Sequence, residues 1–465
     1  MEPNFHVNHK PIAIINKTGD AIPNDVHAVS VCLPTWESNI AYEEGRLELN
    51  IGYPRFLMNE KVRQLNNGRI IFSNRYFAQF CQKYCDVGFS SIVINRATLF
   101  VMAEDTDKVK KFWQHTGLGI CSRHAEAILE NKVFENNPKD LERVISKIKS
   151  FLSVKEDDIY LFSSGMTAIF MAFLITPGPF VMFGFPYLDS LKILEKYGKC
   201  TFVTKLEELN DIKDIGTIFM EFPANPLLSM IDLETIQQIA TKRKAKVVID
   251  DTLTTFYNAD LSKYCDVLVT SLTKSFSGYG NVCAGSLCLS QTSQHYDLLK
   301  SKISEMYRSD INWIYAGDLS ALALNCADYE FRLLAMQRNS NLFTIFLMDK
   351  LKAYPNIVAN YYHPEKYNKA LWDKYCTGSC HLFSLEFATE DLAQRYYDDL
   401  KLNKGPSLGN WCTLVCPYTV LAHYNELEWA ASYGVKKHLL RISIGCELNL
   451  ISIFEKSFEK LLVNN

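Results

Sequence analysis

The sequence lacks a long apolar run and a large excess of charge of either sign. Its longest apolar stretch, residues 168–185, is interrupted by Thr-Pro-Gly-Pro at 176–179, whereas a membrane-spanning helix needs about 20 consecutive apolar residues. The formal net charge is −3 over 465 residues, which gives no electrostatic indication of nucleic-acid binding. We therefore expect no membrane segment and no nucleic-acid partner.

The first 20 residues also lack the apolar core of a signal peptide. Fourteen cysteines are scattered along the chain, as expected for reduced thiols in a cytoplasmic protein. A nuclear location stays open as an alternative. A four-ligand metal set is missing as well: Cys81, Cys85, Cys376, Cys380 and His381 have only loose ligand spacing. We expect no metal site.

A regular alternation of strand-like and helix-like segments begins near residue 158. Strand-like runs are predicted at 159–162, 180–183, 200–203, 217–220, 246–249 and 267–269, with helices at 167–174, 188–197 and 233–243. Alternating strands and helices indicate a mainly parallel, doubly wound α/β sheet.

The rest of the chain divides around this region. Residues 1–60 read as an extended arm, and residues 61–330 as the large domain, with an inserted small α/β segment at about 68–116 that receives no functional account. A mostly helical stretch covers 304–352. Residues 331–465 are predicted to form a smaller C-terminal α/β domain.

Small polar residues follow several of the predicted strands. Ser163, Ser164, Gly165 and Met166 lie where a strand ends and a helix begins, a place that suits a phosphate group. A plain helix cap at Ser164 is the alternative of equal weight.

Single chemical groups stand after four other strands. Tyr187 could stack on a planar cofactor or simply pack, and Asn225 could bind a ligand oxygen or form a turn. Asp250 ends a buried apolar strand, where a carboxylate needs a cation, a helix cap or a basic partner. Lys274 could act as a nucleophile or be a solvated loop residue. Near it, the hydroxyls of Ser271 and Thr273 could hold a phosphate.

Taken together, these groups follow one another as phosphate turn, aromatic ring, amide, carboxylate and lysine, all at strand ends of one predicted sheet. A lysine that forms a Schiff base and an acid that pairs with a ring nitrogen are typical of pyridoxal phosphate enzymes. The sequence therefore predicts a pyridoxal phosphate site around Lys274.

The chain also resembles a known family. Matching motifs lie at 27–36, 52–56, 163–166, 221–226, 250–252, 271–274, 407–409 and 440–445. They are similar to those of the Cys/Met-metabolism family of pyridoxal phosphate enzymes, and more closely to its fungal cystathionine γ-synthase branch. The resemblance implies the type I, aspartate aminotransferase-like fold.

This resemblance implies roles for the candidate residues. Lys274 would carry the cofactor and act in catalysis with Tyr187, which would lie on the ring face. Asp250 would pair with the pyridine nitrogen, and Asn225 would contact the phenolic oxygen. The implied phosphate ligands are Ser164, Gly165, Met166, Ser271 and Thr273, and the implied substrate ligands are Arg441, for the α-carboxylate, and Ser407. Tyr53 and Arg55 would reach the cofactor of a neighbouring subunit, which implies an obligate homodimer or a homotetramer.

The implied reaction joins an O-acylhomoserine, acetyl or succinyl, to cysteine and yields cystathionine. Alternatives are the use of sulfide to give homocysteine, cleavage of cystathionine, and an inactive regulatory homologue. The chain departs from the family pattern at Asp251, where asparagine is usual, at 275–279 and at 410–412. These departures concern the substrate pocket more than the cofactor site, so the choice of substrate stays open.

Overall fold

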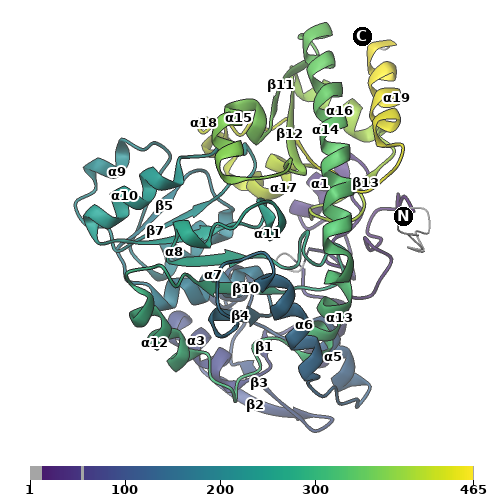
Figure 1. Ribbon diagram of the computed structural model, residues 1–465. Helices are drawn as coiled ribbons and strands as arrows, with labels where there is room; N and C mark the ends of the chain where they lie inside the picture. The colour runs from purple at the N-terminus through teal and green to yellow at the C-terminus, as the bar shows by residue number, and fades with distance from the viewer. Residues whose placement is uncertain (1–12, 54–56, 464–465) are drawn as a thin grey trace, which may run out of the picture.

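Three β-sheets and the helices that cover them make up the structure. The computed structural model describes residues 13–53 and 57–463. Figure 1 shows a C-terminal sheet at the top, the central sheet in the middle and a small sheet from the N-terminal third at the bottom. No helix in the described part of the chain is long and apolar enough to cross a membrane.

The central sheet has seven strands in the order β4-β10-β9-β8-β7-β5-β6. They are β4 (Ile159–Phe162), β5 (Phe180–Phe183), β6 (Cys200–Val203), β7 (Thr217–Glu221), β8 (Lys246–Asp250), β9 (Val267–Thr270) and β10 (Gly285–Leu289). Six of them confirm the predicted runs to within one residue. The sequence prediction missed β10, which runs antiparallel to both of its neighbours. The sheet is mainly parallel, as expected.

Both faces of this sheet are buried because its strands are apolar on both sides. In β4, Tyr160 and Phe162 pack into one core cluster and Leu161 into the other. The first cluster includes residues of α7 (Gly165–Ile175), α8 (Leu188–Tyr197) and α12 (Tyr296–Met306). The second includes residues of α6 (Pro138–Lys149), α10 (Leu233–Arg243) and α13 (Ala316–Asn325). Helices on both faces leave the carboxyl ends of the parallel strands as the open edge.

The N-terminal third folds into the small α/β unit expected at 68–116. Its elements are β1 (Ile71–Phe72), α3 (Arg75–Cys85), β2 (Phe89–Ile94), β3 (Ala97–Met102) and α4 (Asp107–Thr116). The β2–β3 hairpin turns at Asn95 and Arg96, which both have positive φ, as a tight hairpin turn requires. Two further helices, α2 (Glu60–Asn66) and α5 (Ser122–Leu129), share its small core, so the unit is larger than predicted.

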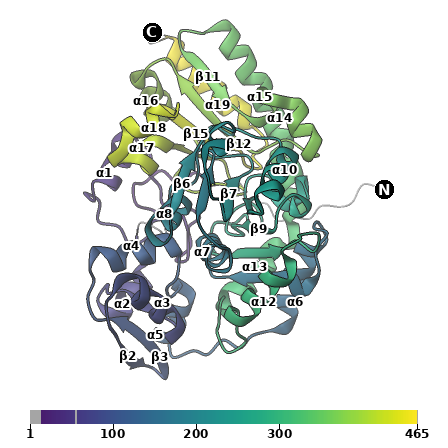
Figure 2. The ribbon, with the colours of Figure 1, turned by 90° about the vertical axis from the view of Figure 1, so that its left-hand side faces the viewer.

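The C-terminal sheet has the order β11-β12-β15-β14-β13. Its strands are β11 (Val358–Tyr362), β12 (Leu382–Phe387), β13 (Asn403–Lys404), β14 (Leu414–Pro417) and β15 (Leu439–Ser443). The long helix α14 (Tyr329–Ala353) packs against it with α16 (Glu390–Asp399) and α19 (Leu450–Val463). Figure 2 shows this layer above the central sheet, with the N-terminal unit below. The remaining α-helices are α1 (Trp36–Glu43), α9 (Glu208–Asp211), α11 (Thr255–Asn258), α15 (Pro364–Tyr375), α17 (Tyr418–His423) and α18 (Leu427–Ser432).

Candidate active site

A cavity of about 260 Å³ lies at the carboxyl ends of the central strands. The predicted site residues that line it are Tyr53, Ser164, Gly165, Met166, Tyr187, Asn225, Asp250, Ser271, Thr273, Lys274 and Arg441. Ser407 adjoins them through Lys274. Arg55 falls outside the described residues. The fold thus brings together groups that are scattered over almost 400 positions of the sequence.

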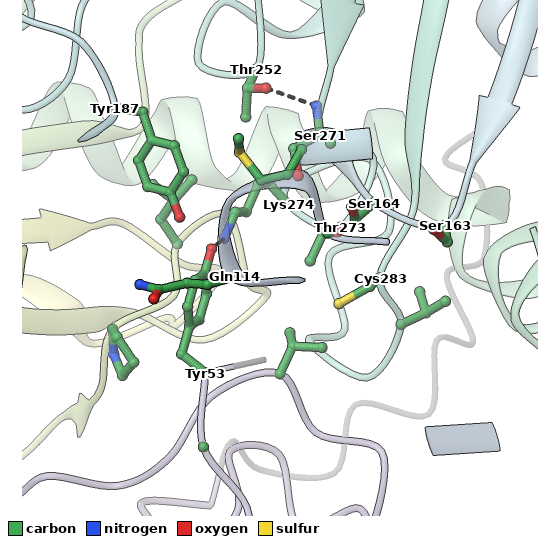
Figure 3. A pocket seen from close by; sticks show the side chains of 18 of the residues that line it. Tyr53, Gln114, Ser163, Ser164, Tyr187, Thr252, Ser271, Thr273, Lys274 and Cys283 are labelled. Carbon is green, nitrogen blue, oxygen red and sulfur yellow. Dashed lines mark hydrogen bonds between the residues drawn. The ribbon is translucent and has the colours of Figure 1, made fainter. Parts of the chain in front are cut away.

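Lys274 lies in the turn that follows β9, and only 8% of its surface is exposed. Its Nζ donates a hydrogen bond to the Tyr53 hydroxyl at 2.7 Å and lies 3.5 Å from the Ser407 Oγ. Figure 3 shows the amine at the centre of the pocket. The two hydroxyls hold this buried amine in one orientation. The alternative of a solvated loop lysine is therefore wrong.

In the one chain described, Tyr53 lies in the pocket of its own chain, and the expected reach into a neighbouring subunit stays a prediction. Its ring centroid lies 4.7 Å from the Lys274 Nζ. The Val29 N–H of the arm donates to the Gly280 carbonyl at 2.8 Å, and within the arm itself the Tyr53 N–H donates to the Tyr42 hydroxyl at 3.2 Å. Within this chain, Tyr53 lies beside Lys274. The homodimer or homotetramer stays a prediction.

Asp250 and Glu221 end the neighbouring strands β8 and β7 and are paired in register. Burial raises the pKa of Asp250 above its usual value. Burial, and then the charge of Asp250, raise the pKa of Glu221 to about 8. Two carboxyl groups side by side at a buried edge favour a cation between or above them. A protonated ring nitrogen would meet this need at Asp250.

The two groups expected beside the cofactor ring are positioned through Glu221. Its carboxylate accepts hydrogen bonds from the N–H of Tyr187 and, at 3.1 Å, from the N–H of Asn225. The Asn225 amide nitrogen donates to the Tyr418 hydroxyl at 3.0 Å. Its buried Oδ1 has no hydrogen-bond partner within the described part of the chain. One carboxylate therefore fixes both the aromatic loop and the asparagine loop.

The predicted phosphate turn is the N-terminus of α7. Ser164 caps this helix by accepting a hydrogen bond from the Thr167 N–H at 3.1 Å, which confirms the helix-cap interpretation, while phosphate binding at this turn stays a prediction. A Cβ on Gly165 would lie 2.7 Å from the Cβ of Ser271. Only glycine allows the start of α7 and the loop after β9 to approach this closely. The N–H groups of the helix start therefore lie next to the Ser271 hydroxyl.

The loop after β9 is held from both sides. The Ser271 N–H donates to the Thr252 hydroxyl at 2.8 Å, as Figure 3 shows. The Thr273 hydroxyl donates to the Ala284 carbonyl at 3.2 Å and accepts from the Ala284 N–H at 3.0 Å. These bonds fix the backbone on either side of Lys274.

Arg441 reaches the same pocket from β15 of the C-terminal sheet. It is buried, its Nη2 donates to the Pro406 carbonyl at 2.6 Å, and its guanidinium carbon lies 4.9 Å from the centre of the Tyr418 ring. A fixed guanidinium is suited to bind a carboxylate with two hydrogen bonds. The pocket thus has an anion-binding group at the end that faces the C-terminal sheet.

These observations fit pyridoxal phosphate. The pocket offers an oriented buried amine at Lys274, a carboxyl pair that favours a cation, and a helix N-terminus with glycine for a phosphate. The orphaned Asn225 Oδ1 shows that this side of the pocket is polar and incomplete among the described residues.

The sequence prediction missed three residues of the pocket. Glu221 received no role, although its place at a strand end beside Asp250 was a usable signal. Tyr418 and Gln114 gave no signal, because they come from helices whose positions depend on distant packing.

A family model described as "Cys/Met metabolism PLP-dependent enzyme" matches residues 135–459. The chain is 30% identical to a cystathionine gamma-synthase-like enzyme of Amanita muscaria, over 91% of this chain and 93% of that protein. It is 28% identical to cystathionine gamma-synthase of Saccharomyces cerevisiae, over 97% and 100%. The solved cystathionine gamma synthase of Xanthomonas oryzae pv. oryzae has the same fold, with a TM-score of 0.61 at 21% identity, over 71% of this chain and 87% of that chain. The match covers the central sheet, the lysine turn and the C-terminal sheet. The chain therefore belongs to the Cys/Met metabolism family of enzymes that depend on pyridoxal phosphate.

Proposed function

We propose that the protein is a cystathionine γ-synthase, which joins an O-acylhomoserine to cysteine. The observation that carries the proposal is the single pocket in which Lys274, Asp250 and Arg441 meet. The similarity to cystathionine gamma-synthases over at least nine-tenths of the chain supports it. In this reaction the Cγ–O bond of the acylhomoserine breaks and a Cγ–S bond forms. The acyl group leaves as a carboxylate, and the thiol proton is released.

The residues that would hold the cofactor follow from the geometry. The helix start at Gly165 and Met166, with Ser271 and Thr273, would bind its phosphate, and Asp250 would pair with its ring nitrogen. Tyr187 would lie on the ring. Bound pyridoxal phosphate supplies an electron sink that makes the protons at Cα and Cβ of an amino acid acidic.

The chain's own groups would then act on the amino acid. Arg441 binds the α-carboxylate, because two backbone carbonyls hold its Nη2 and so fix the guanidinium at the pocket wall. The Lys274 Nζ takes the proton from Cα and moves protons at Cβ. The Tyr53 hydroxyl, 2.7 Å from this nitrogen, keeps it directed into the pocket during the transfer.

An assay of donors and acceptors tests this proposal. The purified protein, supplied with pyridoxal phosphate, is given O-acetyl- or O-succinylhomoserine with either cysteine or sulfide, and the products are identified by mass spectrometry. Cystathionine formed from cysteine supports the synthase. Homocysteine formed from sulfide alone would make the protein a sulfhydrylase, and oxobutyrate released from cystathionine would make it a lyase.

An arginine variant tests the substrate site within the same assay. Arg441→Lys should raise KM for the acylhomoserine about tenfold or more, because one ammonium cannot replace a two-bond guanidinium contact. Retention of the cofactor should be unchanged. The exposed Arg338→Lys is the matched control.

A further inference from the structure

The N-terminal unit supplies one wall of the pocket. Trp113, Gln114 and Gly117, at the end of α4, line the cavity together with residues 119–123. The family model matches only from residue 135 onward, so this wall lies outside the part that the match covers. Residues of such a pocket wall can determine which substrate the protein accepts.

Helix α4 is held beside the predicted cofactor site by two hydrogen-bonded pairs and one aromatic contact. Its His115 Nδ1 lies 2.6 Å from the Asp189 Oδ1, two residues after the aromatic loop, and both side chains are buried. The carbonyl of Thr116 accepts a hydrogen bond from the Thr167 hydroxyl, in the first turn of α7, at 3.2 Å. Phe112 packs edge-on against a ring of α7. The end of α4 is therefore held at a set position beside both predicted cofactor-binding segments.

Gln114 is the residue of α4 that presents a polar group to this cavity. Figure 3 shows its side chain in the same part of the pocket as Tyr53, Lys274 and Tyr187. Its amide has no hydrogen-bond partner among residues 13–53 and 57–463. Gln114 is half-buried at the pocket wall, and a hydrogen bond to a ligand would offset the side-chain entropy that ordering its amide costs.

The three cationic side chains named here have other roles or an ion-pair partner. Arg441 is assigned to the α-carboxylate and Lys274 to the cofactor, and the Arg123 Nη1 lies 3.0 Å from the Asp318 Oδ1. Gln114 thus offers an amide donor on the wall that α4 contributes, whereas Arg441 reaches the same pocket from β15. Because the three residues line one cavity, a substrate held by its α-carboxylate at Arg441 would extend its side chain past Lys274 toward this amide.

We propose that the Gln114 Nε2 donates a hydrogen bond to the acyl carbonyl at the γ-position of the substrate, an inference that rests on the proposed γ-replacement. When the Cγ–O bond breaks, its electron pair goes to the departing oxygen and the acyl group becomes a carboxylate. The hydrogen bond strengthens as this charge develops, and no proton is transferred from the amide. Gln114 would therefore stabilise the departing group as well as recognise it.

The substitution Gln114→Met tests this role, because methionine has a similar length and helix propensity but no donor. We expect kcat/KM for O-acetylhomoserine to fall about 10- to 100-fold, the usual effect of losing a hydrogen bond to a charged group. In a second readout, L-norvaline, which lacks the γ-ester, is titrated into the cofactor-loaded protein and the cofactor absorbance is followed. Its affinity should stay within about twofold of the wild type. Lys110→Met, on the exposed face of the same helix, is the matched control.

Two results would overturn the inference: an unchanged kcat/KM, or an equal loss of affinity for norvaline and for the ester. A thermal melt of each variant separates loss of binding from loss of folding, and Gln114→Asn serves as a second, smaller change. If the wild type binds norvaline but forms no cystathionine, the proposed function fails. Titration of O-acetylhomoserine into wild type and Gln114→Met then decides the role of Gln114 by itself.

Discussion

The cofactor-free protein should lose stability as the pH rises toward 8, and replacing Glu221 with glutamine should remove this loss. Glu221 and Asp250 are paired in register at the ends of β7 and β8, so their carboxyl groups compete for protons. Burial, and then the charge of Asp250, raise the pKa of Glu221 to about 8. The folded chain thus holds a proton at Glu221 at a pH where the unfolded chain has lost it.

The sign and size of the effect follow from this pKa. Because the folded value lies above the ordinary value of 4.5, the contribution of Glu221 to stability is complete below about pH 4.5 and is lost as the pH rises toward 8. Each pKa unit corresponds to about 1.4 kcal/mol, so the full difference is about 5 kcal/mol. Glu221 borders a cavity that admits water, and screening there reduces the measurable change to about 2–3 kcal/mol.

The measurement is the free energy of unfolding by urea at several values between pH 5 and 8.5, for the wild type and Glu221→Gln. The variant should be the less stable protein at pH 5, since glutamine can accept only one of the two backbone hydrogen bonds. The difference between the two proteins should shrink by about 2–3 kcal/mol as the pH rises. A difference that stays constant over this range would refute the raised pKa of Glu221.

Two further predictions concern the assembly of the site. If Tyr53 serves its own chain, co-expression of Tyr53→Phe and Lys274→Ala chains should give no activity above the sum of the separate variants; restored activity would show exchange of the arm between subunits. Gly165→Ala should weaken binding of pyridoxal phosphate about tenfold or more, measured by equilibrium dialysis, because its Cβ would collide with Ser271. Gly88→Ala, where a Cβ meets open space, is the control, and equal affinity in both variants would contradict this reasoning.

Much of the central fold could be predicted because its strands are short, mainly apolar runs separated by helical segments. The strands at 159–162 and 180–183 agree with the structure at both ends. The strand Gly-Ser-Leu-Cys-Leu at 285–289 was missed because its small residues give a weak strand pattern. It also runs antiparallel to its neighbours, so it does not belong to the regular alternation of parallel strands and helices. Local pattern therefore predicted the parallel core but not the strand inserted into it.

The candidate site divides in the same way. Asp250 and Lys274 could be placed from the sequence, because Asp250 directly follows one predicted strand, Lys274 lies in the short loop after the next, and such ends meet at one edge of a sheet. Tyr53 and Gln114 could not be placed, because their positions depend on how the arm and α4 pack against elements far away in the sequence. A local pattern of residues does not predict contacts between segments that lie far apart in the sequence.

The central claim is that Lys274 is the residue that carries the cofactor. The direct test is to load the purified protein with pyridoxal phosphate, reduce it with borohydride, digest it and map the modified lysine by mass spectrometry. The account predicts one reduced pyridoxyl adduct, on Lys274, and its absence from Lys274→Ala. An adduct on a different lysine, or no adduct in the wild type, would contradict the account.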